Sequence, residues 1–191
     1  MRITGGFLRG RSLISPDQKD PVRPTSDRAR LAMMNMLESR GLLRGARVMD
    51  LFCGTGALGI EALSRGSASC IFVDADRGSL DLARRNAGGL DLLSVSSFVQ
   101  SRADALPVRS GDPSYLPATL VFMDPPYHQD LVLSALSCLI QNKMVSSETV
   151  FMIETEKEWT GLFPKDTVIL TQKTHGIARV TLLAFDQEAF I

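Results

Sequence analysis

Short apolar runs and stretches with helical spacing alternate along most of the chain. The apolar runs predict buried strands, at residues 47–52, 70–73, 95–100, 119–123 and 150–153. The helical stretches place apolar residues on one side, at residues 27–40, 60–64, 77–87 and 131–140. Two alternating strands follow, at residues 166–172 and 178–185. This order predicts an α/β fold with a seven-stranded, mostly parallel, doubly wound sheet whose last strand is antiparallel.

The first fifteen residues follow a different pattern. Apolar positions alternate there with basic or small ones, and glycines interrupt them, which predicts a short, twisted β-hairpin. A loop through residues 16–24 follows, and then a helix that ends at Gly41. The apolar side of this helix is expected in the core, with Arg28 and Arg30 lying off it. We therefore divide the chain into a basic extension, residues 1–24, and a main domain, residues 25–191.

The formal net charge is zero, but the charges are unevenly distributed. Residues 1–47 contain ten Lys and Arg and four acids, a net charge of +6, so the remainder carries −6. A basic segment on an acidic body suggests a polyanionic partner, although an uneven solvated surface gives the same count. The chain has no apolar run of bilayer length, and its three cysteines lack metal-ligand spacing. We expect a cytoplasmic monomer without membrane contact or bound metal.

Residues 121–127 read Val-Phe-Met-Asp-Pro-Pro-Tyr, and the predicted strand ends abruptly after Met123. Pro125 and Pro126 lack the N–H that a ladder needs, and each restricts the residue before it. Asp124 and the Tyr127 ring are thereby fixed at the carboxyl end of a strand, where open α/β sheets bind ligands. Asp124 and the Pro125 carbonyl could accept both N–H bonds of an exocyclic amine while Tyr127 stacks on the base. Orientation and charge stabilisation would then let the nitrogen attack an electrophile, although an isolated surface turn fits the same residues.

A glycine-rich loop follows the predicted strand 47–52. Gly54, Gly56 and Gly59 fit the G-x-G-x-x-G pattern between a strand and a helix. Asp74 stands 20 positions beyond Gly54, at the end of the next strand. This is the place of a carboxylate that binds ribose hydroxyls.

Asp50 distinguishes between possible nucleotides. A carboxylate four residues before Gly54 would repel the pyrophosphate of a dinucleotide, but it would attract an ammonium or sulfonium group. Asp104, beyond the strand at 95–100, could accept the adenine amino group. For each acid a helix cap or a solvated loop position is the simpler alternative. Together they predict S-adenosylmethionine as the cofactor.

These motifs resemble those of the Rossmann-like S-adenosylmethionine methyltransferases. Residues 50–59 look like their first motif, and Asp124 to Tyr127 look like the fourth motif of enzymes that methylate exocyclic amines. From about residue 2 to 185 the chain resembles the bacterial 16S ribosomal RNA guanine-N2 methyltransferases of the RsmD type. That resemblance is carried by Arg2-Ile3-x-Gly-Gly with Arg9-Gly10-Arg11, by Arg23-Pro24-Thr25-x-Asp27-Arg28-x-Arg30, and by Gly56-Ala57-Leu58-Gly59-x-Glu61-Ala62-Leu63-Ser64-Arg65.

The resemblance implies a class I methyltransferase fold with an N-terminal β-hairpin arm that grips RNA. It also implies methyl transfer from S-adenosylmethionine to N2 of a flipped guanine in 16S ribosomal RNA, within the 30S subunit or an assembly intermediate. The predicted catalytic residues are Asp124, Pro125, Pro126 and Tyr127. The predicted cofactor contacts are Asp50, Phe52, Gly54, Thr55, Gly56, Gly59, Asp74, Ala75, Ala103 and Asp104. The predicted RNA contacts are Arg9, Arg11, Arg23, Thr25, Arg28 and Arg30.

Three other functions fit part of this pattern. An adenine-N6 methyltransferase of DNA or RNA would use the same Asp-Pro-Pro-Tyr turn, because that turn does not distinguish two exocyclic amines. A nicotinamide-dependent dehydrogenase shares the glycine loop, but Asp50 and the lack of a Tyr-x-x-x-Lys proton relay argue against it. An RNA-binding assembly factor without activity would not need the intact turn at residues 124–127.

Overall fold

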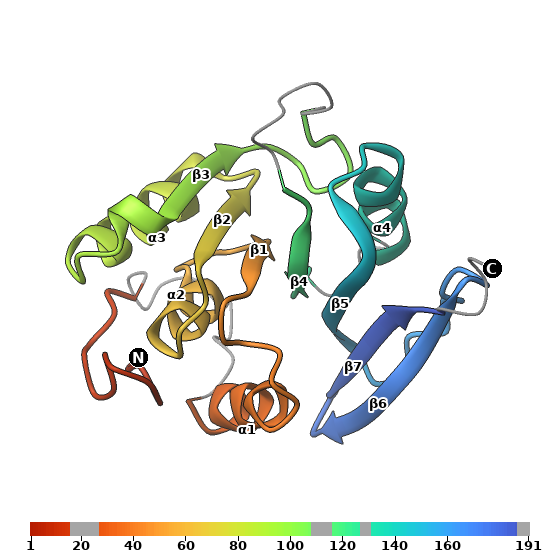
Figure 1. The fold of residues 1–191 in the computed structure, drawn as a ribbon, viewed down its shortest axis with the longest axis horizontal. Coiled ribbons are helices and arrows are strands. Elements are labelled where there is room, and N and C mark those ends of the chain that lie inside the picture. Colours follow the sequence, from red (N-terminus) through yellow and green to blue (C-terminus); the bar gives the residue numbers. More distant parts are fainter. Residues whose placement is uncertain (16–26, 108–115, 127–130, 187–191) are drawn as a thin grey trace.

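The computed structural model describes residues 1–15, 27–107, 116–126 and 131–186. Within these residues seven strands form one mixed sheet in the order β3-β2-β1-β4-β5-β7-β6 (Figure 1). The strands are β1 (Arg47–Leu51), β2 (Ser69–Asp74), β3 (Ser96–Gln100), β4 (Ala118–Met123), β5 (Val145–Glu156), β6 (Thr167–His175) and β7 (Ala178–Phe185). The helices are α1 (Asp27–Glu38), α2 (Ala57–Ser64), α3 (Arg77–Gly88), α4 (Leu131–Gln141) and the short 3₁₀ helix η1 (Leu93–Val95).

The sheet confirms the predicted α/β fold. Strands β1 to β5 pair in parallel, whereas β7 lies antiparallel between β5 and β6. The chain runs outward from β1 through β2 to β3 and then returns to β4 on the other side of β1. Open α/β sheets bind ligands beyond the carboxyl ends of the strands at such a reversal of order. The topology therefore predicts a ligand site between β1 and β4.

Two hydrophobic clusters lie on opposite faces of the sheet. Neighbouring residues of one strand, such as Val121 and Phe122 of β4, belong to different clusters because side chains alternate along a strand. One cluster packs the sheet against α1, α2 and α3, and the other packs it against α4. We call these sides the α1–α3 face and the α4 face. Burial of β4 on both faces explains why it appears in the sequence as a continuous apolar run.

The N-terminal residues form a short antiparallel pairing and lie against α2 (Figure 1). The predicted hairpin in residues 1–15 is present in a short form: Arg2 bridges Ser12, the Ile3 N–H donates to the Arg11 carbonyl and the Leu13 N–H donates to the Met1 carbonyl, each at 3.0 Å. Ile3, Leu8 and Leu13 are buried in the cluster on the α1–α3 face. The segment is therefore packed on the body of the protein. The predicted domain boundary after residue 24 lies outside the described residues and stays a prediction.

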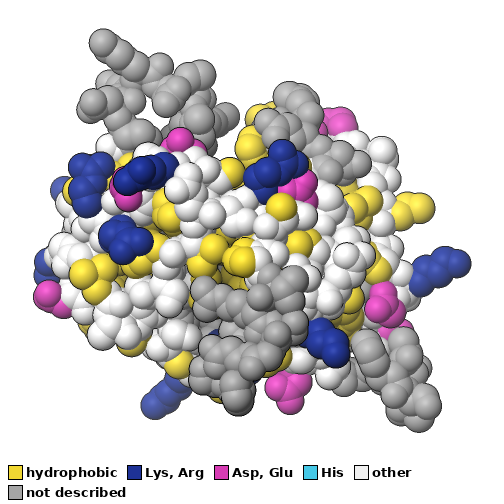
Figure 2. Space-filling model, turned by 90° about the horizontal axis from the view of Figure 1, so that it is seen from above, with side chains coloured by type: hydrophobic (Ala, Val, Ile, Leu, Met, Phe, Trp, Pro, Cys, Tyr) yellow, Lys and Arg dark blue, Asp and Glu magenta, His cyan; other side chains and the backbone are white. Residues whose placement is uncertain are grey.

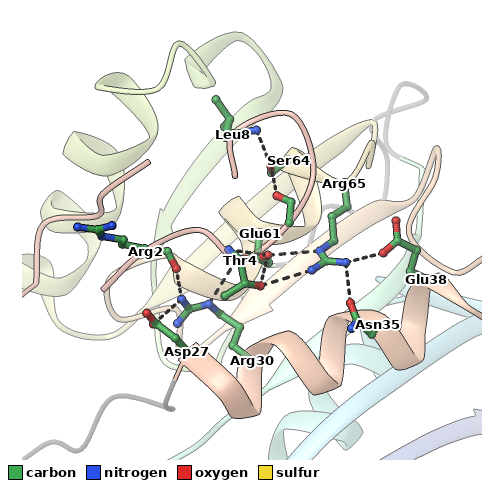
Figure 3. Close-up of polar contacts among 11 residues, drawn as sticks. Arg2, Thr4, Leu8, Asp27, Arg30, Asn35, Glu38, Glu61, Ser64 and Arg65 are labelled. Carbon is green, nitrogen blue, oxygen red and sulfur yellow. Dashed lines mark hydrogen bonds and ion pairs between the residues drawn. The ribbon is translucent and has the colours of Figure 1, made fainter. Parts of the chain in front are cut away.

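Polar contacts with α2 hold this segment in place (Figure 3). The Thr4 N–H donates to both carboxylate oxygens of Glu61, at 3.1 and 2.9 Å. The Leu8 N–H donates to Ser64 Oγ at 3.0 Å, and Ser64 Oγ donates to the Gly5 carbonyl at 2.7 Å. Because α2 begins at the glycine loop, the N-terminal segment and that loop share one helix as their support.

The end of one predicted helix and the start of one predicted strand differ from those in the structure. Helix α1 ends at Glu38, three residues before Gly41, and Gly41 adopts a left-handed φ of 71° in the turn that follows. Strand β5 begins at Val145, well before the apolar run at residues 150–153, and its register against β4 shifts between Ala118 and Leu120. Among the described residues no helix has the length and apolar character needed to cross a bilayer.

The fit of α2 on the sheet gives a first prediction. A Cβ at Gly59 would lie 2.4 Å from a ring carbon of Phe72 and 2.6 Å from Cys70 Sγ. Gly59→Ala is therefore expected to lower the free energy of unfolding by about 1–3 kcal/mol, as overpacking does. The control is Gly88→Ala, where the nearest heavy atom is 3.6 Å away. Urea unfolding measures both, and equal midpoints for the two variants would contradict the tight contact.

Candidate active site

The carboxyl ends of β1, β2 and β4 bring most of the predicted site residues to one edge of the sheet. Leu51 is in register with Val73 on one side and with Met123 on the other. The residues that follow these three positions are Phe52, Asp74 and Asp124. They therefore start from neighbouring positions at the edge where the topology predicts a ligand site.

The loop after β1 turns sharply through three residues in the left-handed region. Phe52, Gly54 and Gly56 have φ values of 61°, 53° and 77°. Glycine adopts such values without strain, whereas a residue such as Phe52 costs of order 1–3 kcal/mol there. The loop is closed by hydrogen bonds from the Gly56 N–H to the Cys53 carbonyl at 2.7 Å and from the Gly54 N–H to Asp74 Oδ2 at 2.9 Å. Strain of this kind is typical of ligand-binding loops.

Asp50 is a buried carboxyl group beneath this loop. It is 2% exposed, and its Oδ2 accepts a hydrogen bond of 2.9 Å from the Gly59 N–H. Burial raises the pKa of Asp50 well above its ordinary value, and the charges of Asp124 and Asp74 raise it further. The hydrogen bond from Gly59 acts in the opposite direction. A cation placed beside this group would favour its charged form, so the site suits a positively charged ligand.

Each carboxylate oxygen of Asp74 accepts a hydrogen bond from a backbone N–H group. Its Oδ2 accepts from the Gly54 N–H and its Oδ1 accepts from the Asp76 N–H, each at 2.9 Å. An ionised carboxylate has about four lone-pair sites, so both oxygens can still accept from hydroxyl groups. The next residue, Ala75, is exposed at the same edge. The arrangement fits the predicted ribose contact, which stays a prediction.

The remaining predicted cofactor residues differ in position. Ala103 is buried in the cluster on the α4 face. Asp104 forms a bidentate pair with Arg102, at 2.8 and 2.6 Å, and this pair lowers the pKa of Asp104. The predicted adenine contact of Asp104 would thus have to share the carboxylate with Arg102. Gly59 lies against β2 and donates to Asp50, and its predicted contact with the cofactor stays a prediction.

Sequence reasoning missed Asn86, which ties the glycine loop to the N-terminal segment. Its side-chain NH₂ donates to the Thr55 carbonyl at 2.9 Å and to the Ile14 carbonyl at 3.1 Å. Its side-chain oxygen accepts from the Ile14 N–H at 2.8 Å. Asn86 lies on α3, far in sequence from both partners, so no local pattern marks it. Thr55, a predicted cofactor residue, is fixed through this amide.

The predicted catalytic turn follows β4 directly. Asp124 is half-buried, Pro125 is buried and Pro126 is exposed. Asp124 follows Met123, which is in register with Leu51 at the start of the glycine loop, so the turn and the loop begin side by side. Tyr127 lies outside the described residues. Cys53 is buried beside the loop, and burial raises the pKa of its thiol, so it is a poor nucleophile.

The structure separates the predicted RNA contacts. Arg9, Arg11 and Arg28 are exposed, and Arg11 donates to the Gly89 carbonyl at 3.3 Å. Arg23 and Thr25 lie outside the described residues. Lys and Arg side chains gather at the left end of the face in Figure 2, the end that α3 occupies in Figure 1. The exposed arginines of α3, which sequence reasoning did not select, are Arg77, Arg84 and Arg85.

The prediction for Arg30 is wrong. Its side chain is 1% exposed, on the buried side of α1 rather than off it. The guanidinium pairs with Asp27 at 2.9 Å and with Glu61 at 3.5 Å, and it donates to the Arg2 carbonyl (Figure 3). A guanidinium enclosed in this way offers no surface to a phosphate. Arg30 joins α1 to α2 and to the N-terminal segment.

Known structures with this fold include methyltransferases. A candidate methyltransferase of Escherichia coli, yhhF, matches with a TM-score of 0.81 and 29% identity, over 97% of this chain and 98% of that one. The strand order, the glycine loop after β1 and the Asp-Pro-Pro turn after β4 are together those of a Rossmann-like class I methyltransferase.

Sequence comparisons specify the family. Residues 1–184 match the family described as Conserved hypothetical protein 95. Ribosomal RNA small subunit methyltransferase D of Haemophilus influenzae is 32% identical over 184 residues, 95% of this chain and 92% of the relative. The protein of the same name from Escherichia coli K12 is 34% identical over 158 residues, 83% and 76% of the two chains. The chain therefore belongs to this family of RsmD-type methyltransferases, which confirms the resemblance seen in the sequence.

The buried Asp50 carboxyl group gives a second prediction. Below pH 3.8, its ordinary pKa, the group is protonated in both the folded and the unfolded chain. As the pH rises above this value, the unfolded chain loses the proton before the folded chain does. The Asp50 carboxyl group therefore lowers the free energy of unfolding at higher pH. Asp50→Asn, which keeps an oxygen for the Gly59 N–H, is expected to be more stable than wild type at pH 7.

The measurement is urea unfolding at several pH values from 4 to 8. The difference in free energy of unfolding between Asp50→Asn and wild type should grow with pH. The reason is that the Asp50 carboxyl group ionises readily in the unfolded wild-type chain but not in the folded one. Asp81→Asn, at an exposed acid of α3, is the control and should show little change. A difference between Asp50→Asn and wild type that is the same at every pH would contradict the raised pKa.

Proposed function

We propose that this protein transfers a methyl group from S-adenosylmethionine to the exocyclic N2 of a guanine in 16S ribosomal RNA. The substrate would be the 30S subunit or an assembly intermediate, and the enzyme would act as a cytoplasmic monomer. The observation that supports the proposal most is that the turn at Asp124 and Pro125 begins beside the glycine loop, at the same edge of the sheet as Asp50 and Asp74. Two relatives, named for methylation of small-subunit ribosomal RNA, support the choice of substrate.

The residues at the carboxyl edge fit the proposed cofactor. When bound, S-adenosylmethionine supplies an electrophilic methyl group on a sulfonium. Asp50 would meet its ammonium or sulfonium charge, since a positive neighbour relieves the cost of ionising a buried acid. Asp74 would accept from the ribose hydroxyls, and the loop from Phe52 to Gly56 would lie along the ligand. Ala75, Ala103 and Asp104 would border the adenine.

The catalytic task of the turn is to orient an amine. Asp124 and the Pro125 carbonyl would each accept one N–H of the guanine amino group, and Tyr127 would stack on the ring. With both hydrogens held, the nitrogen lone pair is free to attack, and Asp124 stabilises the positive charge that develops on nitrogen. Pro125 and Pro126 keep the turn rigid, which keeps the acceptors in place as the charge develops.

RNA would approach across the exposed arginines of the N-terminal part. Arg9, Arg11 and Arg28 are proposed to contact phosphates, together with Arg23 and Thr25. Arg11 lies at the end of α3, where it donates to the Gly89 carbonyl, so the exposed arginines of α3 would add to the same positive region. Such contacts fix the position of the RNA, while a flipped base enters the pocket at the carboxyl edge.

The test is an assay with 30S subunits that lack the modification. Wild-type enzyme and labelled cofactor should yield N2-methylguanosine on nucleoside mass spectrometry; N6-methyladenosine would reject the proposal in favour of an adenine methyltransferase. Asp124→Ala should lower turnover at least about 100-fold, as loss of a preorganised group does, with cofactor binding close to wild type. Glu148→Ala, at an exposed acid near the start of β5, should leave both unchanged. Equal losses of turnover and cofactor binding in Asp124→Ala would refute its catalytic role.

The proposed phosphate contacts give a further prediction. Changing Arg9, Arg11 and Arg28 together to Ala should weaken RNA binding and reduce the slope of log K against log salt by about 0.7–0.9 for each lost contact. Arg44→Ala, at an exposed arginine outside the proposed surface, is the control. Filter binding over a range of salt concentrations measures the slope, and a wild-type slope in the triple variant would exclude these arginines as phosphate contacts.

A further inference from the structure

Glu154 stands next to the proposed catalytic aspartate on the neighbouring strand. β4 and β5 pair in parallel, with Met123 opposite Ile153. The residues that follow this pair are Asp124, directly after the end of β4, and Glu154, within β5. Neighbouring strands lie about 4.8 Å apart, so the two carboxyl groups begin from adjacent positions at the same edge.

Both residues belong to the same face of the sheet. On β4, Leu120 and Phe122 are part of the cluster on the α1–α3 face, and on β5 so are Val150 and Met152. Side chains alternate along a strand with a period of two. The next residues in both series are Asp124 and Glu154, so their side chains start toward the same side.

Glu154 is an unusual residue at its position. It is 9% exposed and follows the buried run Val150 to Ile153. Burying a carboxylate is costly unless hydrogen-bond donors surround it. Both Glu154 and Asp124 already interact with other groups of the protein. An ionised carboxylate has about four lone-pair sites, so each can accept from a ligand as well.

The chemistry of the two acids matches one nucleobase. Guanine presents N1–H next to its N2 amino group, so its donors are adjacent along one edge. Adenine presents an N6 amino group flanked by N1 and N7, which are both acceptors. We propose that Glu154 accepts the N1–H of the target guanine while Asp124 accepts an N2–H, and that Glu154 thereby selects guanine over adenine. The inference concerns one side chain of the proposed active site and rests on the proposed function.

The selection follows from the cost of an unmatched acceptor. With adenine in the pocket, the Glu154 carboxylate would face the lone pair of a ring nitrogen instead of an N–H. Sites built to bind a substrate N–H discriminate strongly against an analogue that lacks it, because the buried group is left unpaired. The Asp-Pro-Pro turn alone does not make this distinction, since both bases carry an exocyclic amine.

The experiment compares two bases at the target position. The methylated guanine is first mapped by mass spectrometry. Small-subunit RNA is then prepared with guanine or 2-aminopurine there; 2-aminopurine keeps the 2-amino group and lacks the N1–H. The ratio of kcat/KM for the two substrates is measured for wild type, Glu154→Gln and Glu148→Gln. Glu148 is an exposed glutamate at the other end of β5, so it is a matched control.

Wild type and Glu148→Gln should prefer guanine by roughly 10- to 100-fold, as expected for one hydrogen bond to a charged group. Glu154→Gln should lose or reverse this preference, because the amide N–H can donate to the bare N1 of 2-aminopurine. Cofactor binding by Glu154→Gln should match wild type, which shows that the variant is folded.

Two results would overturn the inference. The first is equal methylation of guanine and 2-aminopurine by the wild-type enzyme, a result that requires no variant. Alternatively, Glu154→Gln could keep the wild-type preference, including by losing activity on both substrates in equal measure. Failure of the proposed function is distinct, since wild type would then methylate no guanine in the small subunit.

Discussion

The parallel register of β1 with β2 on one side and β4 on the other is the constraint on which the site depends. It sets the ends of three strands side by side, at the point where the order of the sheet reverses. Each strand continues directly into a polar segment: the glycine loop, the turn at Asp74 and the Asp-Pro-Pro turn. A shift of one residue in either pairing would move a carboxyl group to the opposite face of the sheet. The chemistry at the edge therefore depends on apolar contacts along the strands below it.

Several features of this edge reduce stability. Phe52 has a left-handed backbone, and the Asp50 carboxyl group is buried near two other acids. The surrounding structure offsets these costs through close packing of α2 on β2 and through the hydrogen bonds that close the loop. The strain and the buried acid both lie at the edge where the proposed cofactor and base would bind, so the proposed ligands would offset part of these costs.

The sequence predicted the sheet well because buried strands carry a continuous apolar signal. It also identified the glycine loop and the acids at strand ends, since these depend on short spacings within one segment. It failed where the deciding contact is distant in sequence. Arg30 was expected on the surface, but its position follows from Glu61, on another helix. The alternation in residues 1–15 correctly indicated a short antiparallel pairing, but it did not reveal that Thr4 and Leu8 use their backbone N–H groups on α2. Asn86 carries no local signal, because its partners are Ile14 and Thr55.

The three hydrogen bonds of Asn86 also limit how the N-terminal segment can move. One planar amide holds Ile14 by both backbone groups and the Thr55 carbonyl by its NH₂ group. A displacement of Ile14 must therefore break these bonds or shift Asn86 and, with it, the Thr55 carbonyl. The amide thus couples the position of the N-terminal segment to that of the glycine loop.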